Sequence, residues 1–388
     1  MEIRLPNFDR NLVEYRLAHP CPRELMRGGE LRSRIVYAAA HVVCDPLADT
    51  SPGESPCLDW DATLAFRRHL WSLGLRVAEA MDTAQRGAGL DWIASQELIR
   101  RSLAEARAVS GDVACGAGTD HLPAADAARE MVERAYDDQC SFVEQHGGRI
   151  ILMASRALAA CARNADDYRY VYGRILRQVS RPVILHWLGE AFDPLLAGYW
   201  GSPDIAEAME VCLSIITDNQ QKIDGIKISL LDPQYEIAMR RRLPVGVRMY
   251  TGDDFHYDEL IAGDEQGYSD ALLGVFDPLA EFAALAVRAL DEADHPRFRR
   301  TLEPTLPFSR HLFRRPTYFY KTGVVFLAYL NGFQQHFRMA GGQEGARSIV
   351  HLAELFRLAD QIGLFPDPEL AVRRMRLVLS LAGIEQNG

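Results

Sequence analysis

Eight apolar segments of strand length, separated by stretches with helical periodicity, constrain the fold of this chain more than any other feature. The segments lie at residues 34–43, 75–82, 112–118, 149–155, 181–187, 223–232, 245–254 and 269–277. Their continuous apolarity is typical of parallel strands covered on both faces. Eight βα units in about 250 residues is the size of a (β/α)8 barrel, so the sequence predicts an α/β fold of the TIM-barrel class. An open doubly wound sheet is the alternative, but no glycine-rich phosphate loop follows the first segment.

Helical patterns separate these segments and then continue alone to the end of the chain. Residues 58–74 are predicted to form a helix that Asp59 caps and Gly74 ends. After residue 280 only helical patterns remain, among them the aromatic stretch 317–333. The chain is therefore divided into an irregular, charged N-terminal lead-in (1–32), the (β/α)8 barrel (33–280) and a C-terminal helical extension (281–388).

Composition limits the kinds of partner that this chain is expected to have. The net charge of -10 argues against a general nucleic-acid or anionic-membrane surface. The N-terminus lacks a secretory signal pattern, and no apolar run is long enough to span a bilayer. Seven scattered cysteines without a CxxC pair are typical of free thiols in a reducing cytoplasm, which is the predicted location.

Polar residues follow the predicted strands at the ends where barrel enzymes carry out their chemistry. Taken singly, each has a structural explanation. Lys227 could form an ion pair with Asp82 or another acid, His186 could be a core histidine, and Asp253 or Asp254 could cap the next helix. Their coincidence at one end of the barrel favours a functional site. The residues concerned are Asp82, Thr83, Arg86, Thr119, Arg156, His186, Lys227 and Asp254.

Lys227 lies in the middle of the apolar segment "IDGIKISLLD" and has a definite chemical use. Burial of a lysine lowers its pKa, so that a neutral amine is available near pH 7. A neutral amine attacks a ketone or aldehyde and forms a Schiff base, from which enamine formation and aldol cleavage follow. The reaction also needs a proton shuttle, and His186 on the neighbouring strand is a suitable residue type.

The order "RPVILHW … IDGIKISLLD … VRMYTGDD … YSDALLGVFDP" resembles the dihydrodipicolinate synthase and N-acetylneuraminate lyase superfamily of class I aldolases. Members carry the Schiff-base lysine in a Gly-x-Lys context on strand six, a Gly-Asp turn after strand seven and a Gly-x-Gly segment after strand three. These features match Lys227, the segment 252–254 and "CGAGTD". The resemblance covers about 33–340 and is greatest to a divergent, dihydrodipicolinate-synthase-like bacterial branch.

The resemblance implies a lyase, and the departures from the superfamily pattern bear on its substrate. His186 stands where the superfamily has a strand-five tyrosine. The superfamily's Gly-Thr-Thr-Gly-Glu carboxylate loop appears here as "MDTAQRG", in which Asp82 would repel a carboxylate. We expect an aldolase that acts through Lys227 on a small oxo acid or a sugar-derived carbonyl compound. The expected substrate-binding residues are Asp82, Thr83, Arg86, Thr119, Arg156 and Asp254.

Two other functions remain open at this point. A metal-dependent barrel enzyme could use His186, Asp254 and His256 as ligands, with Asp82 nearby. A non-catalytic ligand-binding barrel is the second alternative. For the aldolase no cofactor is expected and the partners are a small-molecule substrate and further copies of the chain, as a homo-oligomeric dimer or tetramer that buries 317–333. The long aromatic loop 188–203 is expected to be a lid or a contact with a neighbouring subunit.

Overall fold

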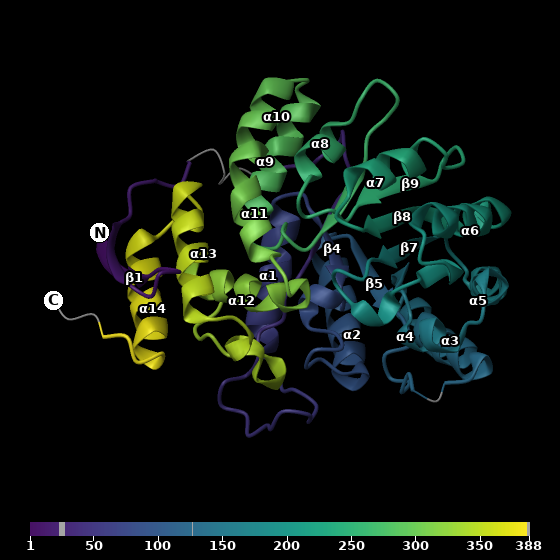
Figure 1. Cartoon of the computed structure of the whole chain (residues 1–388), viewed down its shortest axis with the longest axis horizontal. Helices are drawn as coiled ribbons and strands as arrows, with labels where there is room; N and C mark the ends of the chain where they lie inside the picture. Colours follow the sequence, from purple (N-terminus) through teal and green to yellow (C-terminus); the bar gives the residue numbers. More distant parts are fainter. Residues whose placement is uncertain (23–27, 126, 386–388) are drawn as a thin grey trace.

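The computed structural model describes residues 1–22, 28–125 and 127–385, and within them eight parallel strands close into a barrel. The strands follow one another around the barrel in chain order, and β10 closes it by pairing with β3. This confirms the predicted (β/α)8 barrel (Figure 1). The strands are β3 (Val36–Ala39), β4 (Arg76–Glu79), β5 (Val113–Ala117), β6 (Arg149–Leu152), β7 (Val183–Leu188), β8 (Ile223–Ser229), β9 (Arg248–Thr251) and β10 (Asp270–Leu273).

Alternate residues of these strands fill the inside of the barrel. Side chains on a strand point to opposite faces with a period of two, so Ile184 and His186 share one face of β7. Small residues leave room for large ones: a Cβ at Gly225 would lie 2.6 Å from the ring of Tyr250. The inner core consists of Tyr37, Ala39, Ala78, Met81, Ala114, Ile151, Ile184, Tyr250 and Leu272.

Helices cover the outside of the barrel between successive strands. The predicted helix 58–74 is α1, where Asp59 Oδ1 accepts a hydrogen bond from Ala62 N at 3.0 Å and Gly74 follows in a left-handed conformation with φ +86°. The covering helices are α1 (Trp60–Ser72), α2 (Trp92–Val109), α3 (Arg129–Gln145), α4 (Arg156–Cys161), α5 (Ala165–Gln178), α6 (Ile205–Asp218), α7 (Pro233–Arg240) and α8 (Tyr257–Ala262).

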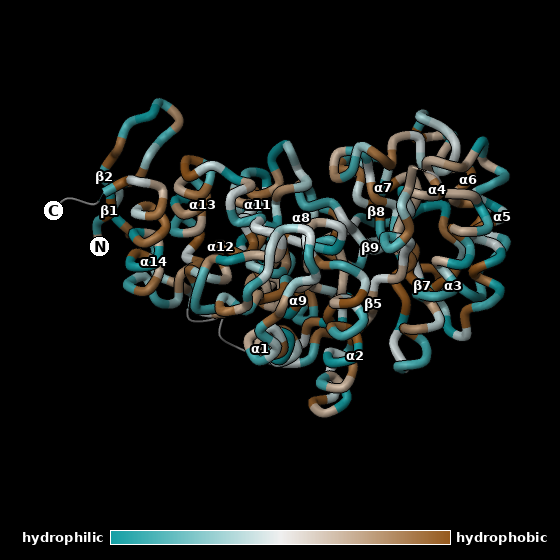
Figure 2. The backbone as a smooth tube through the Cα atoms, turned by 90° about the horizontal axis from the view of Figure 1, so that it is seen from below, coloured by the Kyte–Doolittle hydropathy of each residue, from teal (hydrophilic) through white to brown (hydrophobic). Residues whose placement is uncertain are grey.

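The N-terminal lead-in contains regular structure where irregular structure was expected. Strands β1 (Glu2–Pro6) and β2 (Leu12–Arg16) form an antiparallel hairpin. Ile3 and Leu5 alternate with polar residues and are both buried, so the hairpin has one apolar face that packs on the C-terminal helices. Figure 2 shows the hairpin beside α13 and α14 at one end of the molecule. The alternation was visible in the sequence, but the partner that buries it is more than 340 residues away.

The chain after β10 is helical, as predicted, and part of it lies over the barrel. Each residue of α12 is buried within its own chain, so the aromatic stretch needs no partner subunit to cover it. The homo-oligomer therefore remains a prediction, but the need to bury residues 317–333 no longer supports it. No helix of the described residues has both the length and the apolarity to cross a membrane. The helices are α9 (Ala280–Asp291), α10 (His295–Leu302), α11 (Leu306–Leu312), α12 (Tyr320–Leu330), α13 (Ile349–Gln361) and α14 (Pro368–Leu381).

Candidate active site

A narrow cavity of about 10 Å³ lies at the C-terminal ends of the barrel strands. Strands β7 and β8, the segments after β4, β9 and β10, and the start of α12 all contribute to its wall. Five of the residues predicted from the sequence meet here, namely Asp82, Thr83, His186, Lys227 and Asp254. The other lining residues are Ala39, Met81, Leu188, Phe192, Ser229, Gly274 and Tyr320.

Lys227 lies on β8 in register with His186 on β7 and with Tyr250 on β9. Its side chain is buried, and in the described part of the chain its ammonium group forms neither a hydrogen bond nor an ion pair. A Cβ at Gly252 would lie 2.6 Å from Lys227 Cε, so this glycine leaves the space for the lysine side chain. Burial lowers the pKa of Lys227, while Asp254 and Asp82 act in the opposite direction.

His186 contributes a neutral imidazole to the same wall. It is 3% exposed, and its Nε2 lies 3.4 Å from the hydroxyl oxygen of Ser229 on β8. Burial, and then the positive charge of Lys227, hold the pKa of His186 well below its usual value of 6.5. An imidazole in this state can accept a proton at neutral pH.

Asp254 follows β9 and faces the cavity. Its Oδ1 accepts a hydrogen bond from Val275 N at 3.0 Å. Burial raises the pKa of Asp254, and the charge of Lys227 opposes that increase. A buried carboxyl of this kind is able to exchange protons near neutral pH.

Neither Asp253 nor Asp254 caps the next helix, because the N-cap of α8 is His256; Asp253 instead stabilises the turn that precedes α8. Its Oδ1 accepts hydrogen bonds from Phe255 N at 2.8 Å and from His256 N at 3.1 Å. Its other oxygen pairs with His256 Nδ1 at 2.9 Å. His256 is therefore held against Asp253 and is not part of the cavity wall. Among the described residues, no group of three His, Cys, Asp or Glu side chains is arranged to hold a metal ion.

Asp82 and Thr83 are both tied to the C-terminal extension. They lie in the short 3-10 helix η2 (Asp82–Ala84) that follows β4. Asp82 Oδ1 forms an ion pair with Lys321 Nζ at 2.9 Å, and the Thr83 hydroxyl lies 2.7 Å from the Tyr320 hydroxyl. Because Lys321 occupies Asp82, the ion pair between Lys227 and Asp82 considered from the sequence does not form.

Arg86, Thr119 and Arg156 lie outside the cavity lining. The Arg86 guanidinium binds Asp120 at 2.6 Å and Gln139 and donates to two backbone oxygens of the barrel wall. Thr119 shares a hydrogen bond of 2.5 Å with the Ser155 hydroxyl. Arg156 forms an ion pair of 2.5 Å with Asp193 in the long aromatic loop. These three residues therefore contact neighbouring segments of the barrel and do not line the cavity.

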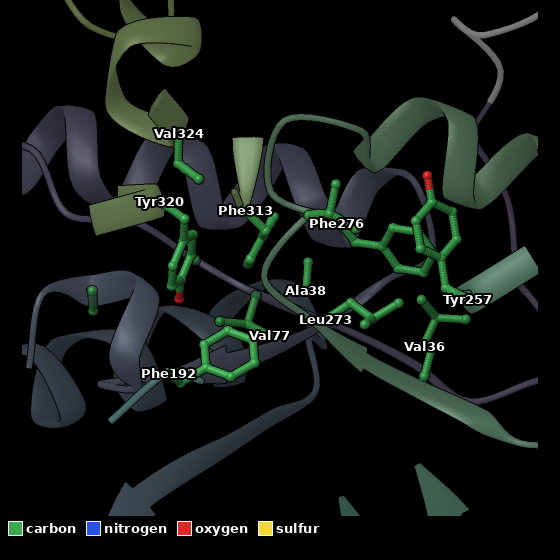
Figure 3. Close-up of a cluster of buried hydrophobic side chains, with 14 of the residues drawn as sticks. Val36, Ala38, Val77, Phe192, Tyr257, Leu273, Phe276, Phe313, Tyr320 and Val324 are labelled. Carbon is green, nitrogen blue, oxygen red and sulfur yellow. The ribbon is translucent and has the colours of Figure 1, made fainter. Parts of the chain in front are cut away.

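A wider groove of about 1090 Å³ adjoins the cavity. It runs between the loop after β7, the start of α7 and residues 315–319. Leu188 and Phe192 line both the groove and the cavity, so Phe192 stands at the passage between them. Figure 3 shows Phe192 in one cluster with Phe313 and Tyr320, and its ring centroid lies 6.3 Å from that of Tyr320.

Several residues of the site were not predicted from the sequence. Phe192, Ser229, Tyr320 and Lys321 line the cavity or contact a residue that does. Ser229 could have been found, because it lies two residues after Lys227 and therefore shares its face of β8. Tyr320 and Lys321 belong to a predicted helix whose position over the barrel mouth is a tertiary property.

Comparisons with known proteins agree with the fold and do not identify a substrate. A family model described as "Protein of unknown function (DUF993)" matches residues 3–384. No curated protein matches the chain.

Several solved structures share the architecture at low sequence identity. Dihydrodipicolinate synthase from Aquifex aeolicus aligns with a TM-score of 0.59 at 13% identity, over 92% of this chain and 100% of that one. The enzyme from Bacteroides thetaiotaomicron gives 0.62 at 14%, over 85% and 99%. YagE, a prophage protein of the dihydrodipicolinic acid synthase family from E. coli K12 in complex with pyruvate, gives 0.63 at 13%, over 90% and 99%. The predicted resemblance is thus confirmed at the level of the fold.

Proposed function

Since the chain belongs to the DUF993 family, whose description leaves its function open, we propose an activity from the site itself. The protein is a class I aldolase or lyase in which Lys227 forms a Schiff base with a small hydroxylated carbonyl compound. One observation carries this proposal: the amine of Lys227 is buried in the cavity wall without an ion-pair partner among the described residues. A structural lysine would be expected to have one.

The proposed reaction begins with addition of the neutral Lys227 amine to the carbonyl carbon. The carbinolamine that forms takes up one proton and loses water, which leaves a protonated imine. The imine nitrogen withdraws electrons, so that a base can remove a proton from the next carbon and produce an enamine. In the cleavage reaction the base instead takes the proton of a hydroxyl one carbon further on; the carbon–carbon bond breaks, an aldehyde leaves and the enamine remains. Protonation of the enamine and hydrolysis of the imine then return the free amine.

His186 and Asp254 are the proposed proton carriers. His186 is neutral and next to Lys227 in register, so it can accept the proton that leaves the substrate carbon. Asp254 follows β9, on the other side of β8 from β7, and holds its proton more readily than an exposed aspartate does. The two groups supply a base and an acid on either side of the amine.

The lining favours hydroxyl groups over a carboxylate on the substrate. Asp82, Thr83, Ser229 and Tyr320 offer oxygen atoms to a ligand. Among the described residues that line the cavity, Lys227 is the only cation, because Arg86 and Arg156 lie outside it with their own carboxylate partners. A carboxylate on the substrate would have no arginine to pair with, whereas substrate hydroxyls could donate hydrogen bonds to the oxygen atoms of the lining.

Borohydride trapping tests the proposal directly. The protein is incubated with dihydroxyacetone or with pyruvate, the compound bound in the YagE structure, and then reduced. Intact mass detects the adduct and peptide mapping locates it. We expect one adduct on Lys227, formed faster with dihydroxyacetone than with pyruvate, and none in Lys227→Met.

Each other outcome has a definite meaning. Faster trapping of pyruvate would contradict the proposed preference for a hydroxylated substrate, but it would still support a Schiff base on Lys227. The absence of any adduct on Lys227 with either compound would overturn the aldolase proposal. Activity of Lys227→Met toward carbonyl compounds would favour metal-dependent chemistry instead.

A further inference from the structure

The chain contains only three lysines, Lys222, Lys227 and Lys321, against 40 arginines. Two of the three are buried at the same end of the barrel. Elsewhere arginine supplies the positive charge, even in the fully buried ion pair between Arg67 and Glu79. Arginine is the better residue for a buried bidentate pair, so Lys321 meets a different requirement from an ordinary structural cation.

Lys321 has a compact environment that suits a single point charge. Its Nζ donates to Asp82 Oδ1 and to Tyr318 O, each at 2.9 Å, and lies 4.0 Å from the centroid of the Tyr318 ring. The side chain is 3% exposed, whereas that of Asp82 is 25% exposed. Asp82 therefore reaches both the lysine behind it and the cavity in front of it.

We propose that Lys321 is a positioning residue. Its ion pair with Asp82 holds this carboxylate so that Asp82 does not form an ion pair with Lys227. The Lys227 amine is thereby left free to attack a carbonyl carbon. This inference rests on the proposed function and adds the residue that keeps the nucleophile available. It also gives the C-terminal extension a role in the reaction, because α12 begins at Tyr320.

The charges around Lys227 support the proposed role. The titratable groups that face it are Asp254 after β9, Asp82 after β4 and His186 on β7. Both aspartates raise the pKa of Lys227, and burial lowers it. Of the two aspartates, only Asp82 forms an ion pair with another cation of the described residues, namely Lys321. Lys321 itself faces Asp82, Arg156, Asp193, Tyr318 and Tyr320.

Removal of Lys321 should therefore couple Asp82 to Lys227. An unpaired carboxylate close to an ammonium group raises the ammonium pKa by about 1–3 units. Less of Lys227 would be neutral at pH 7, and its attack on a carbonyl would be slower in proportion.

The experiment measures borohydride trapping of dihydroxyacetone on Lys227 as a function of pH. In Lys321→Met, we expect trapping at pH 7 to fall at least about tenfold and to recover at higher pH. In the double variant Lys321→Met with Asp82→Asn, the ratio of trapping at pH 7 to trapping at high pH should return toward that of the unchanged protein; the ratio is used because Asp82 also lines the cavity and its loss can lower both rates. Lys222→Met is the matched control, because Lys222 donates to Val179 O at the other end of β8 and should not affect the profile.

The double variant separates positioning from loss of folding. If Lys321→Met merely damages the structure, a second substitution cannot restore this ratio, and that result would overturn the inference. An unchanged pH profile in Lys321→Met, with normal trapping in the unchanged protein, would also overturn it while the Schiff-base proposal stands. If Lys227 is not trapped even in the unchanged protein, the proposed function itself fails.

Discussion

The three lysines illustrate how the nearest partner decides the chemistry of one residue type. Lys222 donates to a backbone oxygen near the surface, and Lys321 is held in an ion pair with Asp82. Lys227 lies in the barrel wall with neither kind of contact in the described residues. Only the last combines burial with a free amine, which is the state that Schiff-base chemistry needs.

At this scale we predict that His186 transfers protons and does not take part in imine formation. His186→Phe should slow deuterium exchange on the carbon next to the carbonyl of dihydroxyacetone by about 100-fold or more, the usual effect of removing a general acid or base. Trapping on Lys227 should remain detectable. Exchange is followed by NMR in deuterated buffer, and trapping by intact mass.

Lys227→Met provides the comparison for this prediction, since it should abolish exchange and trapping together. Full exchange activity in His186→Phe would show that the histidine only packs in the core. Loss of trapping as well as exchange would show that it is required for the imine.

At the scale of elements, the loop between β7 and α6 lies at the passage into the cavity. Asp193 anchors the loop through its ion pair with Arg156 and accepts a hydrogen bond from Leu195 N at 3.1 Å. Phe192, next to this anchor, is buried against Phe313 and Tyr320. The loop was expected to be a lid or a subunit contact, and both remain predictions.

We predict that Phe192→Ala admits larger carbonyl compounds to Lys227. The substitution removes a ring between groove and cavity, so trapping of pyridoxal 5'-phosphate should accelerate relative to glycolaldehyde by about tenfold, equivalent to about 1.4 kcal/mol. The measurement is the ratio of the two trapping rates, because a change in the reactivity of the Lys227 amine affects both rates equally and leaves their ratio unchanged. Leu195→Ala is the control, since Leu195 is on the same loop but 64% exposed. An equal ratio in the two variants would contradict the prediction that the Phe192 ring restricts the entry of large compounds.

At the scale of the whole molecule, stability depends on buried carboxyls as well as on the apolar core. Glu236 on α7 is 1% exposed, and its Oε1 accepts a hydrogen bond from the Ser269 hydroxyl at 2.7 Å. Its Oε2 has no partner in the described residues. Burial raises the pKa of Glu236 from 4.5 to about 8. The folded protein therefore favours the protonated acid.

This shift predicts a loss of stability as pH rises. Between pH 4.5 and about 8 the folded chain holds one proton on Glu236 that the unfolded chain releases, so the free energy of unfolding falls through that window. Glu236→Gln resembles the protonated acid and should remove this dependence. At pH 8.5 we expect it to be about 2–4 kcal/mol more stable than the unchanged protein, with little difference at pH 4.5.

Urea unfolding of both proteins at the two pH values measures this difference. Glu265→Gln is the control, because Glu265 is exposed and lies on the loop between α8 and β10. Equal stability of Glu236→Gln and the unchanged protein at pH 8.5 would contradict the prediction.

The barrel and the position of Lys227 could be predicted from the sequence, because both depend on local patterns. Apolar runs of strand length and helical periodicity are properties of neighbouring residues. Once the barrel is predicted, chain order alone brings the C-terminal ends of the strands together. Lys227, His186 and Asp254 follow from that order, since each belongs to or directly follows a strand.

Only the tertiary structure decided which charges pair and what covers the site. The sequence offered Asp82 as a partner for Lys227, but α12 brings Lys321 to Asp82 instead. Arg86 and Arg156 are near the strand ends in sequence, yet carboxylates at positions 120 and 193 hold them outside the cavity. An ion pair depends on separations of a few ångström between atoms that are far apart along the chain, and no local pattern encodes those separations.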